Sequence, residues 1–254
     1  MTLWEALAVL LAGTAAGTIN AIVGSGTLIT FPVLLAIGLP PVTANVSNTL
    51  GLAPGSLAGA IGYRAELAGQ GRRLIRYGAA SLTGGLIGAA LLIVAPGAFD
   101  AVVPVLILTA LVLVVLQPRV ARAMAARRAA GTLPPATDGG PLLLLLIALT
   151  GVYGGYFGAA QGVLLLALMG MLLPDTLQTV NGIKNVLALI VNGVAAIFFV
   201  LTSTVDWTAA GLIAVGSTLG GMLGAKVGRR LPPVALRTLI VLVGLAAVTK
   251  LLFF

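Results

Sequence analysis

Apolar runs separated by short polar breaks follow one another along almost the whole chain. A helix needs roughly 20 mostly apolar residues to cross the hydrocarbon layer of a membrane, so this pattern predicts an all-α integral membrane protein. We predict ten helical segments, two of which, 27–39 and 163–173, are too short to cross unaided. The other eight are 3–22, 42–63, 74–95, 101–117, 142–160, 177–201, 207–225 and 234–254.

The ten segments fall into two halves of five that repeat each other. SLTGGLIGA at 81–89 matches STLGGMLGA at 217–225 with an offset of 136 residues, and the breaks GLPP and LLPD also recur at corresponding places. We therefore predict two repeats of about five helical segments each, with the broken or short helices near the membrane centre. The predicted division is a first repeat over 1–117, a linker over 118–140 and a second repeat over 141–254.

Basic residues flank the two glycine-rich copies on opposite sides. Those that precede the first copy are Arg64, Arg72, Arg73 and Arg76, and those that follow the second are Lys226, Arg229 and Arg230. Because basic loops stay in the cytoplasm, equivalent segments should cross in opposite directions, which predicts an inverted-topology repeat. Both termini are then outside and the linker is cytoplasmic. If each short segment only dips back as a hairpin with its predecessor, fewer segments cross but the same orientation follows.

Composition excludes a soluble globular domain. Hydrophobic residues make up 59% of the chain and charged residues 8%, and the mean hydropathy is +1.16. Cysteine and histidine are absent, which removes disulfides, thiolate chemistry and the usual zinc ligand sets, so no cofactor and no metal site is predicted. The net charge of +8 does not indicate nucleic acid binding, because the basic residues lie in short clusters between apolar runs.

Each half carries one segment with a polar stripe. At 100° per residue the members of each stripe fall within about a third of a turn of one another. The first stripe is Asn45, Asn48, Thr49 and Ser56, and the offset of 136 places these on Asn181, Lys184, Asn185 and Asn192.

Lys184 is the unusual member of these stripes. A lysine deep in a membrane helix costs roughly 2.5–3.5 kcal/mol, so its side chain should face a bundle interior or a watery cavity. The alternative is a lysine that snorkels from near a helix end. All six acidic residues lie at segment ends or in loops, so no carboxylate is predicted beside Lys184. A cation without an internal partner favours an anionic substrate.

A glycine-rich break precedes each stripe. The breaks are INAIVGSGTLITFP at 19–32, with Asn20, Ser25 and Thr27 as polar side chains, and YFGAAQGVLL at 156–165, with Gln161. Broken helices expose backbone N–H groups and the positive end of a helix dipole, which transporters use to bind anionic groups. Tight helix packing is the alternative reason for any single glycine.

The paired glycine-rich breaks, each followed by LPP or LPD and an Asn-rich helix, resemble the TauE/SafE family of membrane anion exporters over essentially the whole chain. The family's glycine runs are commonly longer than GSG and AAQG. The resemblance implies a multi-pass carrier in the bacterial plasma (inner) membrane that exports a small sulfur-containing anion, most readily sulfite. The substrate-binding positions that it implies are Asn20, Gly24, Ser25, Gly26, Asn45, Asn48, Thr49, Gly158, Gln161, Gly162, Asn181, Lys184 and Asn185.

The mechanism expected from these residues is alternating access. The anion would sit between the two breaks, paired with Lys184, while the repeats rock to expose it to each side in turn. Without histidine or membrane carboxylates for a proton relay, we predict uniport driven by the membrane potential. The alternatives are an exporter of an organosulfonate or another small anion, and an anion channel. We do not expect an enzyme or a nucleic acid partner, and the carrier would be a monomer or a homodimer in the lipid bilayer.

Overall fold

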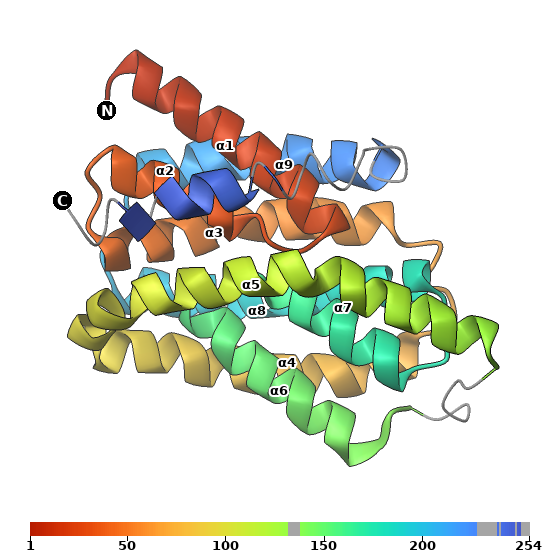
Figure 1. Cartoon of the computed structure of the whole chain (residues 1–254). Helices are drawn as coiled ribbons and strands as arrows, with labels where there is room; N and C mark the ends of the chain where they lie inside the picture. The colour runs from red at the N-terminus through yellow and green to blue at the C-terminus, as the bar shows by residue number, and fades with distance from the viewer. Residues whose placement is uncertain (132–137, 228–237, 239, 247, 250–254) are drawn as a thin grey trace.

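The computed structural model is a bundle of helices (Figure 1), and it describes residues 1–131, 138–227, 238, 240–246 and 248–249. Helices make up most of these residues, and no strand occurs among them, which confirms the all-α prediction. The helices are α1 Leu3–Ile22, α2 Thr27–Ala36, α3 Pro41–Gly62, α4 Gly71–Val94, α5 Pro96–Ala129, α6 Gly140–Tyr156, α7 Gln161–Leu172, α8 Leu177–Thr202 and α9 Trp207–Val227.

Within the described part of the chain, five helices are long and apolar enough to cross a membrane: α1, α4, the first 24 residues of α5, α8 and α9. Helix α3 has 22 residues but is not among them, because its polar stripe and its glycines lower its hydropathy. Helices α2, α6 and α7 are shorter apolar helices of 10 to 17 residues. The chain is thus a multi-pass membrane protein.

The largest difference from the predicted boundaries concerns α5. The sequence predicts a helix over 101–117, whereas α5 begins at Pro96 and continues to Ala129, through the first half of the predicted linker. Proline is favoured in the first turn of a helix, which explains the early start. Pro118 does not end the helix, because the alanines and arginines that follow it are strong helix formers. The tenth predicted segment, 234–254, falls largely outside the described residues, and those described from 238 onwards are helical.

The helices pack as two bundles. Helices α1 and α3 pack against α9, and helices α6 and α8 pack against α4, with α3 of one bundle meeting α8 of the other. Glycines allow the closest approaches. A Cβ atom on Gly220 of α9 would lie 2.0 Å from the Thr14 carbonyl oxygen, and one on Gly84 of α4 would lie 2.1 Å from that of Ala148. Only glycine fits at these two positions, which the offset of 136 relates to each other.

The predicted glycine-rich breaks separate α1 from α2 and α6 from α7. The two chain reversals are built alike: the N–H of Gly24 donates to the Ile19 carbonyl at 3.0 Å, and the N–H of Gly158 donates to that of Tyr153 at 3.2 Å. Both glycines have positive φ angles, +88° and +77°. In Figure 1, α2 and α7 each run back toward the side where the preceding helix begins. The short helices therefore form hairpins with their predecessors.

An ion-pair cluster joins three segments of the α4–α6–α8 bundle at one end. Arg73 of α4 donates to Asp138, just before α6, at 2.7 Å, and to Asp175, just before α8, at 2.6 Å. Arg76 also contacts Asp138 at 3.0 Å. The hydrogen bond from Arg73 holds the pKa of the Asp138 carboxyl below its usual range. The cluster braces this bundle internally.

Candidate functional site

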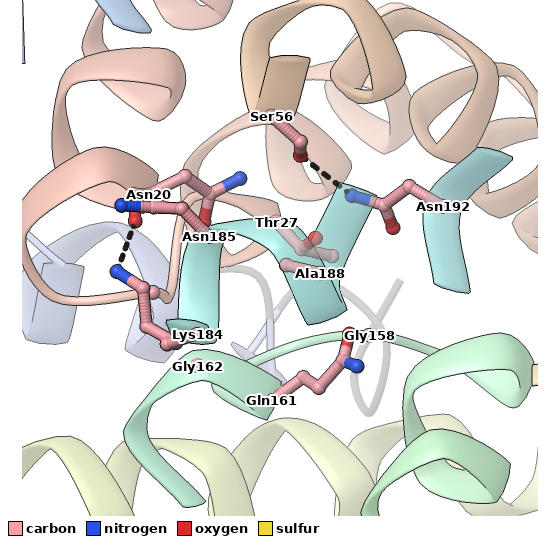
Figure 2. Close-up of a pocket in the computed structure, with 11 residues that line it drawn as sticks. Asn20, Thr27, Ser56, Gly158, Gln161, Gly162, Lys184, Asn185, Ala188 and Asn192 are labelled. Carbon is pink, nitrogen blue, oxygen red and sulfur yellow. Dashed lines mark hydrogen bonds between the residues drawn. The ribbon is translucent and has the colours of Figure 1, made fainter. Parts of the chain in front are cut away.

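A small cavity lies where the two breaks meet between the bundles (Figure 2). Its volume is about 20 Å³. On the same measure a cavity needs about 10–15 Å³ to hold one water molecule, so this one has room for one or two waters. Seven of the predicted substrate-binding residues line it: Asn20, Gly24, Gly158, Gln161, Gly162, Lys184 and Asn185. Four further residues complete the lining: Thr27, Ser56, Ala188 and Asn192.

The two breaks touch each other through glycine backbones. The N–H of Gly162 donates to the carbonyl of Gly24 at 3.1 Å. A Cβ atom on Gly24 would lie 2.3 Å from the Gly162 Cα, and one on Gly162 would lie 2.5 Å from the Gly24 Cα. No larger residue fits at either position without moving the breaks apart. Glycine is therefore required here by the approach of the two chain reversals.

Lys184 is fully buried and its ammonium group lies at the end of α1. Its Nζ donates to the carbonyl of Asn20 at 2.7 Å and to that of Ala21 at 3.3 Å. These carbonyls carry the negative end of the α1 dipole, which a cation stabilises. The prediction that Lys184 has no internal partner is therefore wrong, because sequence inspection counted only carboxylates and not the exposed carbonyls of a broken helix.

Two asparagines of α8 complete the cap on α1. Asn181 and Asn185 both donate through Nδ2 to the Ala21 carbonyl, at 3.1 and 3.3 Å. Asn185 lines the cavity, whereas Asn181 lies beside it, with its Oδ1 atom buried and unpaired among the described residues. The α8 stripe thus holds the end of a helix that belongs to the other bundle.

The polar side chains of the α3 stripe bind α6 and α2, whereas those of the α8 stripe bind the end of α1. Asn45 donates to the Tyr156 carbonyl at the end of α6 at 2.9 Å, which mirrors the contact of Asn181 with α1. Asn48 donates to Thr27 at 3.3 Å and accepts a hydrogen bond from Thr30, so it fixes α2. Six predicted residues are not part of the cavity lining: Ser25, Gly26, Asn45, Asn48, Thr49 and Asn181.

Gln161 and Asn192 are the other polar side chains that shape the cavity. The Gln161 carboxamide packs on Gly154, where a Cβ atom would lie 2.4 Å from the Gln161 Cδ. Its Nε2 atom is buried and has no partner among the described residues. Asn192 donates to Ser56 at 3.0 Å, and these two residues occupy equivalent positions under the offset of 136. Asn192 and Ser56 belong to the predicted polar stripes, whereas nothing in the sequence marks Ala188 as a lining residue.

The lining carries a positive charge and no acidic side chain. The ammonium group of Lys184 and the free N–H of Gln161 are hydrogen-bond donors held in a desolvated place. Charge-assisted hydrogen bonds to an anion are strong in such surroundings. The cavity is therefore suited to a small anion.

Comparisons with known proteins agree with a transporter. The family model described as "Sulfite exporter TauE/SafE" matches residues 9–251. A curated relative from Escherichia coli (strain K12), "Probable membrane transporter protein YfcA", is 26% identical over 240 residues, which cover 94% of this chain and 86% of the relative. A second, "Probable membrane transporter protein" from Haemophilus influenzae, is 26% identical over 242 residues, which cover 95% of this chain and 92% of the relative.

Proposed function

We propose, on the premise that this chain belongs to the sulfite exporter TauE/SafE family of membrane transporters, that it exports a small sulfur-containing anion and that sulfite is its first candidate substrate. The observation that carries the proposal is the buried ammonium group of Lys184 on the lining of a cavity without acidic side chains. In the apolar interior of a membrane such a charge is expensive, and a transported anion would compensate it.

The anion would bind between the two halves of the chain. Lys184 and Gln161 would donate to its oxygens, and the backbones of the two breaks would enclose it. The cavity is small, which favours an inorganic oxyanion over an organosulfonate. An organosulfonate carrier stays the alternative if the cavity widens when the bundles move.

Alternating access would move the two bundles against each other around this site. Three observations support inverted repeats as its basis. The glycine contacts of Gly220 and Gly84 are equivalent, the reversals at Gly24 and Gly158 are built alike, and α4 and α9 run in opposite directions in Figure 1. The hydrogen bond between the equivalent residues Asn192 and Ser56 is what a two-fold axis passing between them would produce.

The orientation proposed from the basic loops places both termini outside the bacterial inner membrane. The exposed Trp4 and Trp207 begin α1 and α9, and both of these helix ends lie on the proposed outer side. Tryptophan is enriched at both membrane interfaces, so these residues support placing the two helix ends at an interface, while the basic loops are the basis for choosing the outer one. With the inside negative, the membrane potential would drive an anion outward with about 2.3 kcal/mol per charge per 100 mV.

Flux measurements on purified protein in liposomes test the proposal. Sulfite efflux should saturate, follow an imposed voltage, and fall at least about tenfold in Lys184→Gln, since a charge-assisted contact of roughly 1.5–3 kcal/mol is lost. The matched control is Lys226→Gln, which removes an exposed lysine at the end of α9 and should leave efflux unchanged. Unsaturable currents would indicate a channel, and equal flux in both variants would refute the proposed role of Lys184.

A further inference from the structure

Ala188 is the small residue on the face of α8 that lines the cavity. It lies four residues after Lys184 and four residues before Asn192, so the three side chains share one face of the helix. All three line the cavity, and Figure 2 shows Ala188 near the middle of its lining. Between two longer polar side chains, α8 therefore presents a single methyl group to the cavity.

The first half of the chain carries a larger residue at the equivalent place. The offset of 136 that relates the two polar stripes also relates Leu52 of α3 to Ala188 of α8. Leu52 is 2% exposed, belongs to the apolar core and does not line the cavity. On α3 a leucine side chain fills the space beside the stripe, whereas on α8 the alanine at the same position leaves room.

This room is small enough for one methyl group to change it substantially. The cavity of about 20 Å³ holds one or two waters, and a methyl group is about as large as a water molecule. Glycine at position 188 would therefore enlarge the cavity by about the space of one water. Valine would add two carbon atoms, which would fill most of it.

Ala188 keeps its place beside Lys184 if the bundles rock. The two bundles would then move against each other, but residues within one helix keep their spacing, so Ala188 stays about one turn from Lys184 in every state. Separation of the bundles would widen the cavity toward its entrance and leave the wall formed by α8 unchanged. The methyl group of Ala188 therefore limits the room next to Lys184 whenever the cavity is closed.

We propose that Ala188 is a specificity-determining residue that sets the largest anion the cavity accepts. This inference rests on the proposed function and narrows it, because the substrate class becomes the small inorganic oxyanions. A sulfonate with a carbon atom on its sulfur needs room that the Ala188 methyl group occupies. The exclusion is steric, so it acts on anions of the same charge and the same oxygen groups.

A matched pair of anions tests the inference. Methanesulfonate, CH₃–SO₃⁻, is the sulfite unit with one methyl group on its sulfur, and at a mildly acidic pH sulfite is mainly a monoanion as well. Each is tested, unlabelled, as a competitor of labelled sulfite counterflow in liposomes. Methanesulfonate should compete at least about tenfold more weakly than sulfite in the wild type, and this ratio should fall about tenfold in Ala188→Gly, the usual discrimination for one carbon in a closed pocket.

Two further variants locate the size limit. The matched control is Ala195→Gly, which places glycine at a buried alanine of the same helix that does not line the cavity. It weakens the helix as Ala188→Gly does, so the ratio should stay at its wild-type value. Ala188→Val shrinks the cavity and should lower sulfite flux at least about tenfold, and it carries the test if Ala188→Gly does not fold. Thermal unfolding in detergent shows that each variant is folded.

The outcomes separate this inference from the proposed function. Equal or stronger competition by methanesulfonate in the wild type, an unchanged ratio in Ala188→Gly, or wild-type sulfite flux in a folded Ala188→Val would overturn the role of Ala188 and leave Lys184-dependent anion transport standing. Failure of the wild type to bind or move either anion would overturn both proposals. A ratio that falls in Ala188→Gly and stays unchanged in Ala195→Gly supports the inference.

Discussion

The contact between the two breaks can be tested by adding one methyl group. Gly24 and Gly38 both have positive φ angles, +88° and +92°, so alanine at either position is strained by roughly 1–2 kcal/mol. Only Gly24 is crowded: its Cβ atom would lie 2.3 Å from the Gly162 Cα, whereas nothing lies within 4 Å of the one on Gly38. Comparison of Gly24→Ala with Gly38→Ala therefore cancels the backbone strain and isolates the crowding.

The crowding has a definite size. Ordinary van der Waals contact begins at 3.4 Å, so the breaks would have to separate by about 1.1 Å, the difference from 2.3 Å. That shift would lengthen the hydrogen bond from Gly162 to Gly24 beyond its present 3.1 Å. We expect Gly24→Ala to lose about 1–3 kcal/mol more stability than Gly38→Ala, the usual cost of overpacking.

Two measurements check this expectation. Thermal unfolding in detergent should rank wild type above Gly38→Ala, and Gly38→Ala above Gly24→Ala. Anion efflux from liposomes should fall at least about tenfold in Gly24→Ala alone, because a displacement of about 1 Å at a binding site is enough to spoil its geometry. If the two variants unfold and transport alike, the breaks do not meet as the structure has them and the reasoning fails.

Two further predictions concern packing and pH. Gly220→Ala should lower the unfolding temperature, because its methyl group would lie 2.0 Å from the Thr14 carbonyl oxygen, whereas Gly211→Ala in the same helix meets nothing within 4 Å and should raise it slightly, as alanine favours helix. The pKa of Asp138 is lowered by the hydrogen bond from Arg73, so the stability from this contact is present above the ordinary pKa of 3.8 and is lost as the pH falls through the lowered value. Unfolding curves recorded against pH should show that acid loss in the wild type and much less of it in Asp138→Asn.

The sequence predicts the helices well where apolar pattern and breaks agree. The predicted bounds 3–22 coincide with α1, and 177–201 differs from α8 by one residue. Thr2 and Thr176 cap the starts of these two helices, and Gly24 follows the end of α1. The bounds of α5 are missed because a proline that usually stops a helix is overridden by its alanine-rich surroundings.

The candidate site is predicted in part, and the reason lies in contacts between distant segments. The periodicity places Lys184 and Asn185 on one face, and both line the cavity. The same periodicity selects Asn45 and Asn48, which instead hold α6 and α2. A stripe on one helix does not reveal which partner each side chain will meet. Lys184 donates to backbone carbonyls at the end of α1, and a sequence pattern of side chains does not predict which backbone groups a break leaves exposed.

Asn48 and Lys184 occupy equivalent places in the two halves, yet only one of them is a cation. If the two halves are repeats of one architecture, as we propose, the second half would supply the charge that attracts the anion, and the first half would supply neutral side chains that hold the helices in place. In a rocking cycle the charge of Lys184 would move with α8, and no equivalent charge would move with α3. The inward-open and outward-open states would therefore have similar shapes but different energies. Such an imbalance would favour one resting state, so the apparent affinity for the anion would differ between the two faces of the membrane, while the membrane potential would still set the direction of net flux.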